Sequence, residues 1–293
     1  MSKLRMREEK RVLLRDETCT VFLRGLSTLL IVATLLCLAC PEAKCSGEPR
    51  RGAFVTAFAG PSPTPGHISP HVAYNLVPSN ERFFVYVPFG YTGSEAYGLI
   101  VFTYADASAG LPAGWQAVLD ARKYIFVAAE NAGNDQLHGR RLGLAVMAAL
   151  EMMKTYRVDP ARVYAAGFSG GARMSGLLAF YQTDIFRGTL QNCGADFYKA
   201  VPIVSATTQL DTAGQPYGRL AASDAEVRGA KKVSFVLITG TNDFRRGNIL
   251  DIFHGGFERD GFQAKLFDVP GMGHDICDGD TLARALDFLE GGR

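Results

Sequence analysis

The sequence has little net charge, few histidines and a single tryptophan for its 293 residues. Its 31 lysines and arginines nearly balance 29 aspartates and glutamates, so the formal net charge is only +2. Outside the N-terminus no basic run is interleaved with aromatic residues, which argues against a nucleic-acid partner. The five histidines form no His-Glu-x-x-His pattern and no other close ligand spacing with carboxylates. We therefore expect no catalytic metal and no cofactor.

Size and composition favour one large domain. With 47% hydrophobic and 20% charged residues, the chain can bury the core of one α/β domain, whereas two domains would be cramped. No internal repeat interrupts it. We expect an N-terminal signal over residues 1–45, an extended proline-rich lead-in over 46–80 and the α/β domain over 81–293.

The N-terminus has the pattern of an export signal. A long basic region precedes the apolar stretch 26–40, which is short for a membrane span. Ala39, with Cys37 two positions before it, gives a small-residue cleavage pattern, so we expect a periplasmic or extracellular protein without a stable membrane span. Two alternatives stay open: the segment is retained as an anchor, or Cys40 is lipidated.

Export would make disulfides possible, because thiols pair in oxidising compartments. Four of the six cysteines lie in or beside the predicted signal, which leaves Cys193 and Cys277 in the body of the domain. We predict a disulfide between these two. The alternative is two separate buried thiols.

From residue 82 onward, apolar segments of strand length alternate with longer helical patterns. This alternation predicts an α/β fold with a mostly parallel sheet covered by helices on both faces. The predicted strands are 82–88, 99–103, 124–128, 162–167, 200–204, 233–239 and 264–269, and the predicted helices are 113–122, 137–156, 171–182, 248–260 and 281–290.

One serine lies among small residues where a strand gives way to a helix. In Gly167-Phe168-Ser169-Gly170-Gly171 the glycines would permit the sharp turn known as a nucleophile elbow. Such a turn would present the Ser169 hydroxyl to solvent and direct the Gly170 backbone N–H toward a developing oxyanion. The pentapeptide also occurs as an ordinary turn, but the predicted strand before it and helix after it favour the elbow.

Serine needs a base within hydrogen-bond reach, and the base needs an acid that orients it. His274 lies in the loop between the last predicted strand and the last predicted helix, which favours it over the other four histidines. Asp243 follows the predicted strand 233–239 at the same edge of the sheet, with Asp251 as the second choice of acid. The order Ser169, Asp243, His274 is the order that α/β-hydrolases use.

The segment 156–164, running into the elbow, resembles the secreted polyhydroxybutyrate depolymerase and feruloyl esterase-like group of α/β-hydrolases. The resemblance extends from Arg82 to the C-terminus and implies that Ser169, Asp243 and His274 correspond to nucleophile, acid and base. Members of this group usually have His-Gly after the third strand, where this chain has Tyr104-Ala105-Asp106. We expect the Asp106 backbone N–H to complete the oxyanion hole with that of Gly170.

These residues predict an exported serine esterase that acts on small-molecule or carbohydrate esters through an acyl-enzyme. Trp115, the only tryptophan, is a candidate for substrate stacking, with a packing role as the alternative. Two other functions remain open. One is a binding protein on a hydrolase fold with little or no turnover, and the other is a serine peptidase or amidase that uses the same three residues.

Overall fold

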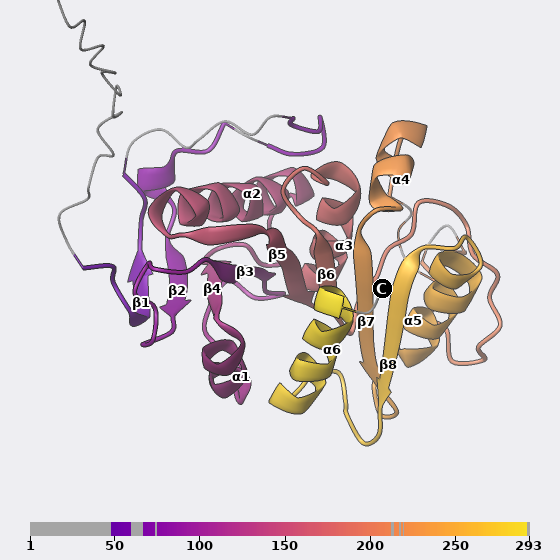
Figure 1. The fold of residues 1–293 in the computed structure, drawn as a ribbon. Helices are drawn as coiled ribbons and strands as arrows, with labels where there is room; N and C mark the ends of the chain where they lie inside the picture. Colours follow the sequence, from indigo (N-terminus) through magenta and orange to yellow (C-terminus); the bar gives the residue numbers. More distant parts are fainter. Residues whose placement is uncertain are drawn as a thin grey trace, which may run out of the picture. The chain divides into compact units, whose positions relative to one another are not determined.

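A computed structural model describes residues 48–59, 67–73, 75–211, 214–216, 218 and 220–291. Its centre is an eight-stranded sheet in the order β1-β2-β4-β3-β5-β6-β7-β8 (Figure 1). The pairs β1·β2 and β2·β4 are antiparallel, and all the other neighbours are parallel. The expected mostly parallel sheet is thereby confirmed.

The elements follow the chain in the order typical of a parallel sheet with helical crossovers. The strands are β1 (Gly52–Thr56), β2 (Phe83–Val87), β3 (Tyr97–Thr103), β4 (Tyr124–Ala129), β5 (Val158–Phe168), β6 (Gly188–Asn192), β7 (Ser234–Gly240) and β8 (Gln263–Val269). The helices are α1 (Trp115–Arg122), α2 (His138–Thr155), α3 (Gly170–Tyr181), α4 (Asp224–Ala230), α5 (Arg246–Ile252) and α6 (Gly279–Gly291), with a 3-10 turn at Pro78–Asn80 and a π-helical turn at Phe253–Glu258.

Helices cover both faces of the sheet (Figure 1), so central strands such as β3 and β4 are buried along their whole length and read as apolar runs. In β3, Leu99 and Val101 pack with residues of α2 and α3 in one hydrophobic cluster. Ile100 and Phe102, which alternate with them, pack with residues of α1 and α6 in the other cluster. The expected fold with helices on both faces is confirmed.

One predicted strand was wrong. Residues 200–204 are irregular, with Ile203 and Val204 exposed, and the strand that pairs with β5 is β6. Thr189, Gln191 and Asn192 of β6 are all fully buried but polar. These polar residues remove the apolar run by which a buried strand is recognised.

The segment before residue 82 contributes to the sheet rather than only leading into it. β1 extends the sheet beyond β2, and Phe58 and Val72 belong to the larger core cluster. The predicted signal and Cys40 lie outside the described residues. In the part of the chain that the structure describes, no helix has the length and apolarity needed to cross a membrane.

Candidate active site

Ser169 lies at the turn between β5 and α3, near the middle of the sheet. Its backbone has φ 53° and ψ −118°, a strained conformation for a residue with a side chain. The Ser169 N–H donates to the Asn192 carbonyl over 2.8 Å, which fixes the turn against the end of β6. The geometry is that of a nucleophile elbow.

Close backbone contacts explain the small residues around this turn. A Cβ atom on Gly167 would lie 2.3 Å from the Gly171 carbonyl oxygen, and one on Gly171 would lie 1.9 Å from the Thr103 carbonyl oxygen. Both positions therefore exclude any residue larger than glycine. The first of these contacts closes the elbow, and the second brings the start of α3 against the end of β3.

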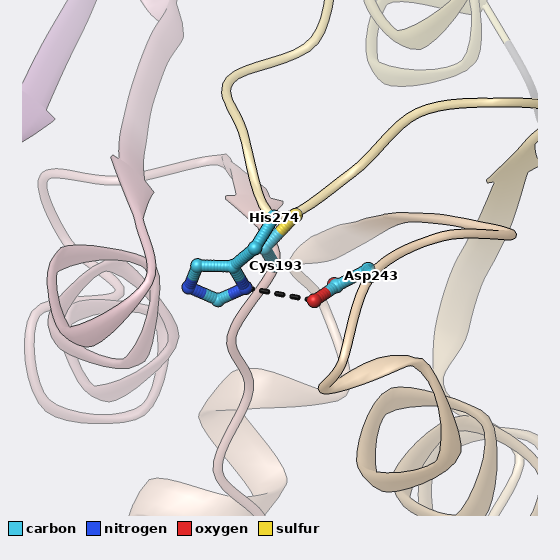
Figure 2. A group of neighbouring side chains, drawn as sticks. All are labelled: Cys193, Asp243 and His274. Carbon is cyan, nitrogen blue, oxygen red and sulfur yellow. Dashed lines mark hydrogen bonds and ion pairs between the residues drawn. The ribbon is translucent and has the colours of Figure 1, made fainter.

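The structure brings Ser169, His274 and Asp243 together from three separate loops. The Ser169 Oγ and His274 Nε2 atoms are 3.0 Å apart, and His274 Nδ1 is 2.8 Å from Asp243 Oδ1. Figure 2 shows the second of these contacts. Serine, imidazole and carboxylate thus form the hydrogen-bonded chain that nucleophilic acyl transfer requires.

The Asp243 carboxylate is fully buried yet well supplied with donors. Burial alone would raise its pKa, but hydrogen bonds from His274, the Arg245 backbone N–H, the Thr239 hydroxyl and the Cys193 thiol outweigh burial and hold the pKa below its ordinary value. Thr239 Oγ1 is 2.8 Å from Oδ2, and the Arg245 nitrogen is 2.9 Å from Oδ1. The carboxylate is therefore ionised at neutral pH and fixed in orientation.

Two aromatic rings flank the His274 imidazole. The Phe168 and Phe244 ring centroids lie 5.1 Å and 4.3 Å from that of His274. Phe244 is 54% exposed, and the side chain of His274 is 18% exposed. Phe244 thus places an apolar surface beside the imidazole at the solvent-facing side of the site.

Cys193 directly follows β6 and lies behind the imidazole. Its Sγ is 3.2 Å from the Asp275 carbonyl oxygen, and the thiol also interacts with the Asp243 carboxylate. Burial, followed by the Asp243 charge, raises the pKa of this thiol well above its ordinary range, so it is neutral and a poor nucleophile. Cys193 and Cys277 are both free in the structure, so the predicted disulfide was wrong and the alternative of two buried thiols applies.

Asn192, at the end of β6, ties the elbow to the loop that carries His274. Its Nδ2 donates to the Gly167 carbonyl, and its Oδ1 accepts from the Cys277 N–H, each over 3.1 Å. The side chain is fully buried. Sequence reasoning missed this residue because the strand itself was missed, and a lone asparagine carries no signal of its own.

The loops after β3 and β4 are joined beside the elbow. The Asn134 and Asn131 N–H groups donate to the Ala105 and Ala107 carbonyls over 2.7 and 2.6 Å. Among the described residues, the N–H of Asp106 between them has no hydrogen-bond acceptor. The role of the Asp106 N–H as the second oxyanion donor stays a prediction, as does the role of the Gly170 N–H at the start of α3.

A buried arginine holds the same two loops. Arg141 Nε donates to the Ala132 carbonyl over 2.7 Å, and its Nη2 donates to the Tyr104 carbonyl over 3.0 Å. Burial, and then the charge of Arg173, lower the pKa of Arg141 to about 10. Arg141 therefore keeps its positive charge at neutral pH.

Two other sequence-based candidates have structural roles. Trp115 is fully buried between Phe102 and Phe126, and its indole N–H donates to the Cys277 carbonyl over 2.8 Å. The prediction that Trp115 stacks against substrate was wrong, because neither face of its ring is exposed to solvent. Asp251, the second choice of acid, accepts hydrogen bonds from the Thr208 hydroxyl and from the backbone N–H groups of residues 204 and 205. It therefore holds the loop 204–208 and does not orient His274.

Comparison with known proteins supports this architecture. No family model matches the sequence. Over an alignment of 186 positions, the sequence is 25% identical to poly(3-hydroxyalkanoate) depolymerase C from Paucimonas lemoignei, and the alignment covers 57% of this chain and 45% of that protein. This chain therefore matches less than half of its curated relative.

Solved structures with similar folds include a depolymerase and a ferulic acid esterase. A poly(3-hydroxybutyrate) depolymerase from Bordetella parapertussis has a TM-score of 0.53 at 16% identity, over 83% of this chain and 92% of that one. A ferulic acid esterase from Anaeromyces mucronatus has a TM-score of 0.52 at 16% identity, over 80% and 87%. The predicted resemblance is confirmed, and the fold is that of the α/β-hydrolases.

Proposed function

We propose that this chain, which has the α/β-hydrolase fold, is a serine hydrolase that cleaves carboxylic esters. One observation carries the proposal: a strained serine, an imidazole and a buried carboxylate lie in hydrogen-bond sequence, with separations of 3.0 and 2.8 Å. A serine held only for packing would need neither the unfavourable φ nor the ordered pair behind it. The sequence likeness to a named depolymerase supports the same reaction class.

In the proposed first step, Ser169 Oγ attacks the ester carbonyl carbon while its proton moves to His274 Nε2. The ionised Asp243 stabilises the imidazolium that forms, through the hydrogen bond at Nδ1. The carbonyl oxygen becomes negative and accepts hydrogen bonds from the backbone N–H groups of Gly170 and Asp106. The nearby Arg141 cation keeps the loop that carries Asp106 in place.

The alcohol then leaves with the proton from Nε2, and an acyl group remains on Ser169. Water then enters, and its oxygen attacks the acyl carbon while one of its protons moves to Nε2. The bond between the acyl carbon and Ser169 Oγ breaks, the acid leaves, and Nε2 returns the proton to Oγ, which restores the serine. We also propose that residues 1–45 direct export, which Edman sequencing of the mature protein tests. A mature N-terminus within residues 1–39 would contradict the predicted cleavage after Ala39.

Relatives with named substrates act on hydroxyalkanoate polyesters and ferulic acid esters, so both classes belong in the first substrate panel. Exposed Phe244 beside His274 favours an ester with an apolar portion next to the reacting carbonyl. We propose soluble small-molecule or carbohydrate esters as the substrate class.

The test is turnover of p-nitrophenyl acetate, methyl ferulate and short 3-hydroxybutyrate oligomers by the purified chain. Ser169→Ala should abolish turnover of every ester that the wild type hydrolyses. Ser175→Ala is the matched control: it removes a hydroxyl from the same helix, one that is buried and bonded to the Ala172 carbonyl. Unchanged turnover by Ser169→Ala would contradict the assignment.

A further inference from the structure

Three side chains that can bind a metal ion converge near the candidate nucleophile, and the His274 imidazole is one of them. One ligand atom each from Cys193, Asp243 and His274 lies within 4.8 Å of the other two. Figure 2 shows the three side chains together, with a ring nitrogen of His274 facing a carboxylate oxygen of Asp243. The three residues follow β6, β7 and β8, so no sequence spacing connects them. We propose that they form an inhibitory site for Zn²⁺ and for chemically similar divalent cations such as Cd²⁺.

The donor set and spacing suit such a cation. Zinc takes thiolate, imidazole and carboxylate ligands at about 2.0–2.3 Å, which places two ligands of one ion about 3.5 Å apart. His274 Nδ1 and Asp243 Oδ1 start 2.8 Å apart, so they need to separate only slightly to admit the ion. The Asp275 carbonyl oxygen, 3.2 Å from Cys193 Sγ, can serve as a fourth ligand or hold a bound water.

Charge also favours a divalent cation. When the sulfur binds as a thiolate, Cys193 and Asp243 together bring two negative charges to the site. A cation of charge +2 balances both, whereas in its absence the thiolate faces the carboxylate at close range. Entry is from the imidazole side, because the His274 side chain is 18% exposed and the Asp243 side chain is fully buried.

Binding releases one proton and blocks the base. The thiol proton leaves to solvent as the sulfur binds the ion. The imidazole proton on Nδ1, which points to Asp243 in the resting site, is replaced by the metal bond and moves through solvent to Nε2. With a proton on Nε2, His274 cannot accept the Ser169 hydroxyl proton. This consequence for turnover rests on the proposed function, whereas binding itself does not.

Binding is therefore tested in a chain that needs no turnover. Full-length Ser169→Ala is titrated with Cd²⁺, and the ultraviolet thiolate-to-metal charge-transfer band is recorded in three forms: Ser169→Ala alone, with Cys193→Ser, and with Cys277→Ala. Cys277 is the matched control, a second buried thiol outside the cluster. Cysteines near the N-terminus contribute the same background to all three forms.

The saturating band should persist with Cys277→Ala and fall to background with Cys193→Ser, which preserves the size of the side chain and a donor to Asp275. A band of equal size in both forms would overturn the proposal. In chains that retain Ser169, Zn²⁺ should inhibit ester turnover by the wild type and by Cys277→Ala, and EDTA should reverse this inhibition. Cys193→Ser should need at least tenfold more Zn²⁺ for the same degree of inhibition. If no form hydrolyses esters, the proposed function fails, and the Cd²⁺ band still decides the metal site.

Discussion

Two fully buried amide side chains allow a matched test of how hydrogen bonds hold the candidate site. Asn192 bonds to the Gly167 carbonyl and to the Cys277 N–H, so it links the elbow to the His274 loop. Gln182, at the end of α3, is equally buried, but neither its Oε1 nor its Nε2 has a partner among the described residues. Replacing the two amides should therefore have opposite effects.

The expected changes in the free energy of unfolding follow from the buried polar groups that lose or never had a hydrogen-bond partner. Asn192→Ala leaves a buried N–H and a buried carbonyl without their partner, and each unsatisfied group costs about 1–3 kcal/mol. We expect the free energy of unfolding to fall by about 2–4 kcal/mol, because the carbonyl retains a second lone pair and its cost lies at the low end of that range. Gln182→Leu keeps the volume and removes two unpaired polar atoms, so stability should stay equal or rise by up to about 2 kcal/mol.

Urea denaturation followed by fluorescence measures both changes, and ester turnover measures whether the elbow and the His274 loop stay aligned. Asn192→Ala should lose turnover at a urea concentration where it is still folded, whereas Gln182→Leu should keep it. Asn192→Asp, which retains the acceptor for the Cys277 N–H, should lie between wild type and alanine in stability. Equal destabilisation by Asn192→Ala and Gln182→Leu would refute the reasoning.

Three further changes test other parts of the account. Trp115→Phe keeps most of the packing and loses the indole hydrogen bond, so the free energy of unfolding should fall by about 1–2 kcal/mol in urea, and no change would count against that bond. Arg141→Met removes the donors that join the loops after β3 and β4, so kcat should fall about tenfold or more with little change in KM, and a rise in KM alone would contradict a role at the oxyanion site. Burial raises the pKa of Glu290, but hydrogen bonds from Tyr124 and Arg162 outweigh it and hold the pKa below its ordinary 4.5. The ionised Glu290 therefore contributes fully to the free energy of unfolding above that pH, and the contribution is lost as the pH falls. Below about pH 4.5, Glu290→Gln should lose less of its free energy of unfolding than the wild type, and parallel curves of stability against pH would contradict this.

The nucleophile, acid and base could be chosen from sequence because each has a local reason. Gly167 and Gly171 are required where backbone segments come within contact distance, and this requirement marks the elbow. Asp243 follows β7, which reads as an apolar run, and His274 follows β8, in which polar residues alternate with apolar ones. Parallel strands end at one edge of a sheet, so their loops had to lie near Ser169.

Features that depend on contacts between distant residues could not be predicted in this way. Asn192 is important through bonds to residues 25 and 85 positions away, and its strand carries buried polar residues that hide it. The positions of the two cysteines in the sequence could not distinguish a Cys193–Cys277 disulfide from two buried thiols. It also gave no sign that Cys193 would lie beside Asp243 and His274, because these residues meet only in the folded sheet.

The central claim is that Ser169 is activated by His274, and fluorophosphonate labelling followed by mass spectrometry of the digested protein tests it most directly. The wild type should carry one phosphonyl adduct, on the peptide that contains Ser169. His274→Ala, which removes the base, should label at least a hundredfold more slowly, in line with the usual contribution of such a base. An adduct on another residue, or the same labelling rate in His274→Ala as in the wild type, would contradict the account.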